Sequence, residues 1–84
     1  MKGAMSPTVF RYKSYRFHFF SREEERMHVH VSCANGEAKF WLEPEIALAV
    51  NHGLSPREVR ELYAVVEEQR DEIIQYWHDH FGVN

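Results

Sequence analysis

Hydrophobic and polar positions alternate with a period of about two through much of the first half of the chain, which indicates strands. Two such runs, residues 8–12 and 15–20, flank Lys13-Ser14, and this arrangement predicts a first hairpin with a short turn. The charged segment that follows, residues 21–27, is expected to lie in solvent.

A second hairpin is predicted within residues 28–42, where two further runs flank Asn35-Gly36. Asn-Gly between alternating runs favours a two-residue turn in which both residues take positive φ. Such a turn pairs Val31 with Phe40 across the two strands. The first half of the chain is therefore expected to form a four-strand antiparallel meander.

A short helix is predicted next. Pro44 fits the first turn of a helix and Gly53 fits its end, so we expect a helix through Ile46, Leu48 and Val50.

A long C-terminal helix is predicted from Pro56 to Phe81, and Gly82 ends it. Ser55 and Glu58 have the spacing of a capping box, which satisfies free backbone N–H groups where a helix begins. The helix would be about 39 Å long, whereas a compact domain of this size is about 30 Å across. The helix must therefore bend or extend beyond the domain, and an extension would offer a surface to a partner.

The expected strand register separates the two faces of the sheet. If the long helix packs on the apolar face, the opposite face displays cationic, imidazole and aromatic groups: Arg11, Arg16, His18, Phe20, His28, His30, Lys39 and Trp41. Basic groups between exposed rings suit a ligand that carries phosphates and stackable bases, such as RNA. The predicted binding residues are Arg11, Arg16, Lys39 and Trp41, although an ordinary solvated sheet face has the same pattern.

Histidines provide two further candidate sites. His28 and His30 lie two apart on one strand, so their side chains are about 7 Å apart on one side, a spacing that can hold a metal. A zinc site needs a third ligand, for which His18 or Glu37 is the candidate. Alternatively, His28 and His30 act as acid and base in RNA cleavage, while Lys39 or Arg16 holds the phosphate. Plain surface histidines would look the same.

The end of the long helix is a candidate interface. Trp77 and Phe81 lie on its apolar stripe near the C-terminal end, and Arg70 interrupts that stripe. Arg70 either extends its stem to the domain edge or anchors an interface. We expect a homodimer or a protein partner to bind here.

Composition limits the class of protein. The chain has 84 residues, a net charge of −3 and a single cysteine, which excludes an internal disulfide. No apolar run spans a membrane and no signal peptide is evident, so we expect a cytoplasmic protein with no membrane partner. No phosphate loop, serine triad or nucleotide fingerprint is present, so no cofactor is expected. Residues 5–82 are predicted to form one domain, and residues 1–4 an extension left by cloning or by a misplaced start codon.

Motifs along most of the chain resemble a small prokaryotic family, domain of unknown function 4160. They are Pro7-Thr8-Val9, Tyr15-Arg16-Phe17, His28-Val29-His30-Val31, Gly36-Glu37-Ala38-Lys39-Phe40-Trp41-Leu42, Gly53-Leu54-Ser55 and Trp77-His78-Asp79-His80-Phe81-Gly82. The resemblance implies a gene context like that of toxin–antitoxin pairs, often beside another small protein (domain of unknown function 2442). It therefore implies a protein partner and assigns no catalytic residue.

The sequence thus predicts an α+β domain: a four-strand antiparallel meander, a short helix, and a long C-terminal helix packed on one face. The expected function is an interaction module of a toxin–antitoxin-like pair that binds a protein partner encoded by a neighbouring gene, with RNA as a further ligand. The alternatives are an RNA-cleaving toxin that uses His28 and His30, and a metal-binding domain.

Overall fold

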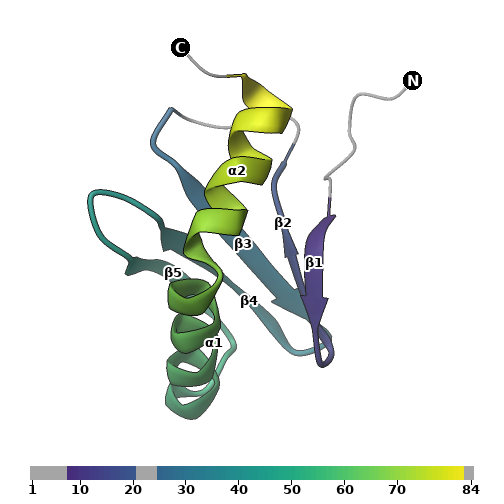
Figure 1. Cartoon of the computed structure of the whole chain (residues 1–84). Coiled ribbons are helices and arrows are strands. Elements are labelled where there is room, and N and C mark those ends of the chain that lie inside the picture. The colour runs from purple at the N-terminus through teal and green to yellow at the C-terminus, as the bar shows by residue number, and fades with distance from the viewer. Residues whose placement is uncertain (1–7, 21–24, 83–84) are drawn as a thin grey trace.

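The computed structural model describes residues 8–20 and 25–82, which form an antiparallel sheet with two helices on one face (Figure 1). The strands follow one another across the sheet in chain order, as a meander. They are β1 (Thr8–Tyr12), β2 (Tyr15–His18), β3 (His28–Cys33), β4 (Gly36–Trp41) and β5 (Ala47–His52), and the helices are α1 (Pro56–Glu68) and α2 (Arg70–Phe81). The α+β class and the meander are confirmed. No helix in the described part of the chain is long and apolar enough to cross a membrane.

The sheet has five strands, and the predicted short helix is wrong because that segment is β5. The sequence around Leu48 and Val50 alternates Ala with larger apolar residues, a pattern that fits a strand as well as a helix. An isolated helix of so few residues is unstable in water. As a strand, the segment pairs with β4, where Lys39 lies opposite Val50, and this pairing satisfies its backbone groups.

The predicted long helix bends at Gln69, which confirms the first of the two alternatives for it. The backbone N–H of Gln69 donates to the Val65 carbonyl at 2.9 Å and closes α1, and the Gln69 carbonyl accepts from the Ile73 N–H at 2.9 Å in α2. The bend lets both helices follow the sheet, so that Leu62 of α1 and Ile73 of α2 are both fully buried. The capping box at Ser55 is present as predicted.

The second hairpin has the predicted faces but a different register. Val29 lies opposite Phe40, whereas the sequence predicted Val31 there. The difference is two residues, and an even shift keeps every side chain on its expected face. The expected positive φ values at Asn35 and Gly36 are also wrong, since positive φ in the described ranges occurs at Lys13 (54°), Gly53 (87°) and Gly82 (89°).

The core is formed by the helix-facing side of the sheet, where the largest buried side chains include Phe17, Phe19 and Phe40. One core residue departs from strict alternation along its strand. A register shift between Thr8 and Phe10 turns Val9 into the core, although strict alternation would place it on the opposite face.

Hydrogen bonds join the tip of the first hairpin to α1. The hydroxyl of Tyr15 donates to the Glu58 carboxylate at 2.6 Å, and Lys13 Nζ lies 2.5 Å from Glu61 Oε2. The bond to Glu58 raises the pKa of Tyr15 to about 12. The pKa of Glu58 is lowered, first by the Ser55 backbone N–H and then by Tyr15, and the pKa of Glu61 is lowered first by Lys13.

These contacts predict a loss of stability in acid. Glutamates whose pKa is lower in the folded state stabilise the fold above their ordinary pKa of 4.5, and this contribution is lost as the pH falls through the folded values. We expect the free energy of unfolding in urea to decrease more between pH 7 and about pH 3 in the wild type than in a Glu58→Gln/Glu61→Gln variant. Equal pH dependence of the two proteins would contradict this assignment.

Candidate binding surfaces

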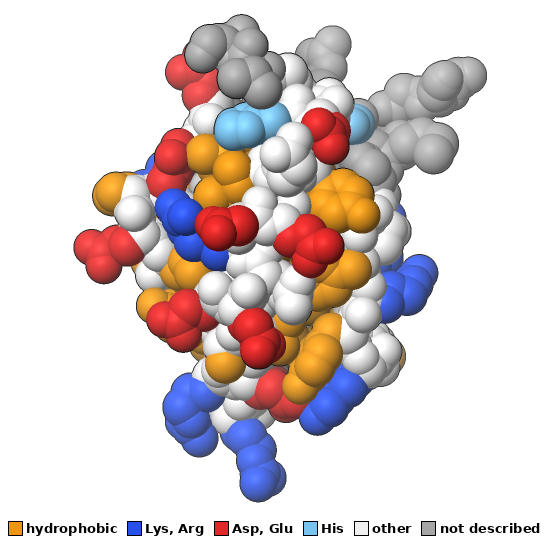
Figure 2. All heavy atoms as spheres, in the orientation of Figure 1, with side chains coloured by type: hydrophobic (Ala, Val, Ile, Leu, Met, Phe, Trp, Pro, Cys, Tyr) orange, Lys and Arg blue, Asp and Glu red, His pale blue; other side chains and the backbone are white. Residues whose placement is uncertain are grey.

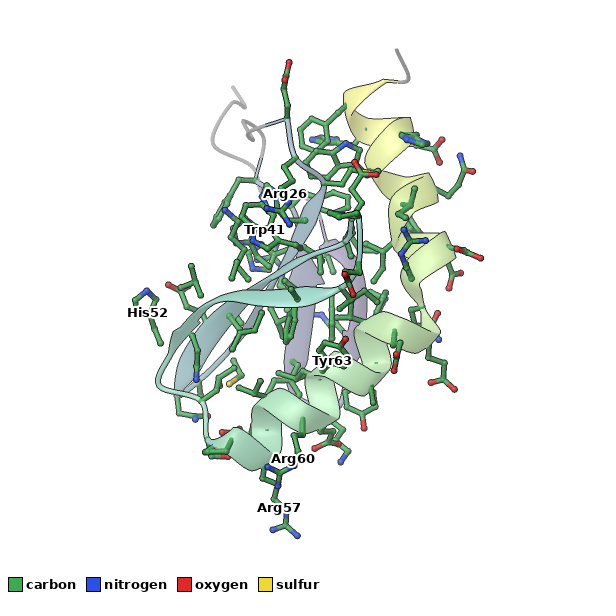
Figure 3. The ribbon with its side chains drawn as sticks, turned by 90° about the vertical axis from the view of Figure 1, so that its left-hand side faces the viewer. Arg26, Trp41, His52, Arg57, Arg60 and Tyr63 are labelled. Atoms are coloured by element: carbon green, nitrogen blue, oxygen red, sulfur yellow. The ribbon has the colours of Figure 1, made fainter. Side chains whose placement is uncertain are left out.

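The face of the sheet that the helices leave open is organised in three rows of cross-strand neighbours. Directly opposed residues point to the same side of a sheet, so the strand pairing defines each row. From β1 toward β5, the rows are Arg11, Arg16, Ser32, Glu37 and His52; then Thr8, His18, His30, Lys39 and Val50; and then His28, Trp41 and Ala47. The structure therefore places the predicted binding residues and the three histidines on one face. In Figure 3, Arg26, Trp41 and His52 lie on the side away from the helices.

The three histidines form a continuous group of rings. The ring centroid of His30 lies 5.6 Å from that of His18 and 4.9 Å from that of His28. The expectation that all three are displayed to solvent is wrong, because His18 is buried and His28 is 0% exposed. His28 is enclosed by Trp41 of β4 and by Trp77, which α2 brings over this end of the sheet.

Burial gives His28 a structural role. Its Nδ1 lies 2.7 Å from the Arg26 carbonyl, an arrangement in which the ring N–H donates and fixes the chain at the start of β3. General acid–base catalysis requires both imidazoles of a pair to reach the substrate. The burial of His28 therefore argues against the RNA-cleaving alternative.

The histidine cluster does not have the form of a metal centre. Within residues 8–20 and 25–82, no group of three or more His, Cys, Asp or Glu side chains could hold a metal ion. His18 Nε2 lies instead 3.2 Å from the Ser32 hydroxyl, and the rings of His18 and His30 are stacked. The histidine side chains lie close together, as the sequence predicted, but the rings of His18 and His30 contact each other by stacking.

Trp41 is held by two cations. The guanidinium of Arg26 lies 4.1 Å from the ring centroid and the ammonium of Lys39 lies 4.4 Å from it. Both are cation–π distances. A stacking base would have to displace or share these contacts, so Trp41 is less available to RNA than the sequence suggested.

A shallow hollow lies beside this cluster on the open face. It has a volume of about 150 Å³, and its lining includes Phe20, His30, Lys39, Val50 and His52. Phe20 is 43% exposed, and its ring centroid lies 4.3 Å from that of His30. Two imidazoles, an ammonium, an exposed ring and the carboxylate of Glu37 therefore meet at this hollow.

The predicted interface residues contribute to the fold. Arg70 Nε donates to the Leu42 carbonyl at 3.1 Å and ties the start of α2 to the end of β4. Trp77 is buried, with its ring 5.3 Å from that of Phe19, and Phe81 packs partly buried against both. These contacts attach α2 to the sheet as far as Phe81, the last residue of the helix.

A second surface is a groove between β1 and the helices. One part of it has a volume of about 260 Å³ and is lined by Val9, Phe10, Arg11 and Tyr12 on one side and by Val65, Glu68, Gln69, Glu72 and Tyr76 on the other. A second hollow of about 310 Å³ continues it toward the end of α2 and shares Val9 and Tyr76 with the first. Figure 2 shows hydrophobic side chains in a row beside the helices, with acidic side chains next to them. We call this continuous surface the β1 groove.

Comparison with known proteins identifies the family. The model of a family described as domain of unknown function (DUF4160) matches residues 14–78. The chain belongs to this family. No curated protein and no solved structure matches it. The DUF4160 match includes His18, His28, His30 and His52 and the helix wall of the first hollow, from Val65 to Tyr76. β1 precedes the matched span, and Asp79 and His80 of the second hollow follow it.

Sequence reasoning missed the β1 groove in this DUF4160 domain. Phe10 and Tyr12 alternate with Arg11, so the expected register put them on the apolar face that the long helix covers. The available signal was that β1 is the first strand of a meander, and such a strand has one unpaired edge. The helix residues that form the other side of the groove are positioned by the bend at Gln69, and the sequence did not determine whether the helix bends or where.

Proposed function

We propose that this DUF4160 protein is a binding module that docks a protein partner, as one member of a toxin–antitoxin-like pair. The observation that supports this most directly is the β1 groove. An apolar groove beside an open sheet edge is a common docking site for a segment of another protein. The gene context implied by the family resemblance supports the same proposal.

The groove has the character of an interface. Tyr76 is 45% exposed in its wall, and tyrosine is among the residues enriched at protein interfaces. Val9 and Val65 provide an apolar base, and Glu68 and Glu72 provide a charged rim. An apolar centre with a polar rim is the usual anatomy of a protein–protein contact.

RNA is a second candidate ligand, supported by one observation. The hollow on the open face combines Lys39, His30 and His52 with the exposed ring of Phe20. A cationic group beside a stacking ring is the minimum for binding a single-stranded nucleotide. The chain carries a net charge of −3, which opposes the approach of a polyanion.

Co-expression with the product of the neighbouring gene tests the proposal. We expect a tagged DUF4160 protein to retain the untagged neighbour through affinity purification and size-exclusion chromatography, because the groove buries apolar surface on docking. Treatment with ribonuclease separates the two candidates, since a direct protein complex survives it and an RNA-bridged one does not. Elution of the two proteins as separate peaks at micromolar concentration would overturn the partner proposal.

A further inference from the structure

The β1 groove combines an unpaired strand edge with a facing helix wall. Among the strands in the described part of the chain, β1 pairs with β2 alone and lies at the edge of the sheet. Tyr12 and Tyr15 flank the two-residue turn and form the hydrogen-bonded pair that closes it. Hydrogen-bonded and non-hydrogen-bonded pairs alternate along an antiparallel ladder, so the backbone N–H and C=O of the next residue, Arg11, are directed away from β2. These backbone groups can accept another strand.

The groove is long enough for an extended segment. The two hollows share Val9 and Tyr76 and together involve every residue of β1. Five residues of strand extend about 17 Å, since each adds about 3.4 Å. A strand laid beside β1 would direct alternate side chains toward the helices, where Val65 and Tyr76 lie.

The charge of the helix wall selects among such segments. Glu68 and Glu72 are exposed on this wall, and in the described part of the chain neither carboxylate has an ion-pair partner. Arg11 also lines this hollow, but its side chain shares the open face with Arg16, and among the described residues it forms no ion pair with either glutamate. The wall therefore favours a cationic side chain.

We propose that the β1 groove binds an extended segment of a partner protein as an additional edge strand, with a Lys or Arg of that segment paired to Glu68 and Glu72. This rests on the proposed partner-binding function and specifies its site and the chemistry of the segment. The other edge strand of a second copy, β5, does not offer the Lys or Arg of this proposal, since Ala47–His52 contains neither.

The test uses the full chain with two matched double variants. Glu68→Lys/Glu72→Lys reverses the charge of the groove wall. Glu67→Lys/Asp71→Lys makes the same change in charge one position earlier on the same helices, at exposed residues outside the groove lining. Both pairs are on the surface, so both variants are expected to fold, and circular dichroism verifies this.

The probe is a fluorescein-labelled nine-residue peptide, Gly-Thr-Lys-Val-Arg-Val-Lys-Thr-Gly, measured by fluorescence anisotropy. We expect Glu68→Lys/Glu72→Lys to weaken binding at least about tenfold and the matched control to change it less than about threefold, because only the first pair faces the segment. A peptide with Glu in place of Lys and Arg should instead bind Glu68→Lys/Glu72→Lys more tightly than the matched control. Backbone amide shifts in NMR should be concentrated in β1, α1 and α2.

Several results would overturn the proposal. They are equal affinities of the two double variants for the peptide, amide shifts concentrated in β5, or no binding by the wild type at about millimolar peptide. Dimerisation through β1, detected without peptide as a concentration-dependent mass together with concentration-dependent amide shifts in β1, would assign the groove to a second copy. If the co-expressed neighbour binds both double variants equally, the partner proposal stands and the groove is not its site. If the neighbour binds no form of the protein, the proposed function fails independently of the peptide result.

Discussion

Replacing Trp77 with alanine is expected to destabilise the domain by about 3–5 kcal/mol, the usual cost of removing a large aromatic side chain from a core. Trp77 is 7% exposed, and its ring centroid lies 4.4 Å from that of Phe81 and 5.3 Å from that of His28. Small domains bury a thin core and have little stability to lose. A large unfolded fraction of Trp77→Ala without denaturant, measured by circular dichroism and urea titration, is the expected result.

The adjacent Tyr76 provides the matched control. It is 45% exposed in the β1 groove, so Tyr76→Ala should change the free energy of unfolding by less than about 1 kcal/mol. The same variant should weaken binding of the strand peptide, since Tyr76 lines both hollows of the groove. A Trp77→Ala protein that is as stable as the wild type but no longer binds its partner would contradict the core assignment. It would restore the interface that the sequence predicted at the helix end.

The contrast between Trp77 and Tyr76 shows which features the sequence specifies. Helical periodicity located Trp77 on the apolar stripe, and the capping box at Ser55 located the start of α1, because both depend on residues a few positions apart. The strand faces were predicted for the same reason, since a period of two survives a register error of two residues. What Trp77 covers was not predictable, because that depends on the bend at Gln69 and on the path of α2 across the sheet.

The histidine cluster shows the same limit. Strand pairing brings His18, His28 and His30 together, as the sequence indicated. The burial of His28 was missed because Trp77, which covers it, comes from a helix more than forty residues away in the chain. β5 was missed because the alternation around Leu48 fits a strand as well as a helix. The segment forms a strand because it pairs with the edge of β4, a contact that the local sequence does not show.

Gly36 gives a second test, in which the sequence-based and structural explanations predict different outcomes. The Asn-Gly pair suggested that Gly36 is required for a positive φ, yet its φ is not positive. Instead, a Cβ at this position would collide with the His52 carbonyl oxygen and would lie 2.9 Å from the Gly53 carbonyl carbon. Gly36 is therefore required for a close approach between the turn that joins β3 to β4 and the chain that follows β5.

The opposing backbone has little freedom to move away. Gly53 has a φ of +87°, and a Cβ there would lie 2.5 Å from the Asn35 carbonyl oxygen, so the two segments are in mutual contact. Just beyond, the side chain of Asn51 accepts a hydrogen bond from the Leu54 N–H at 3.1 Å and donates to the Leu54 carbonyl at 3.0 Å. This fixed turn leads directly into α1, so displacing it would disturb both β5 and the helix.

Gly36→Ala is therefore expected to lower the free energy of unfolding by about 1–3 kcal/mol, as overpacking of a closed contact does. Gly36→Asn distinguishes the two explanations, because Asn tolerates positive φ and would be accepted in a turn that needs only that conformation. The steric explanation predicts that Gly36→Asn is at least as destabilising as Gly36→Ala, whereas Glu37→Ala, at the next and exposed position, has little effect. Urea titrations of the three variants measure these differences. A Gly36→Asn protein as stable as the wild type would show that the turn conformation, and not the contact with the chain after β5, determines this position.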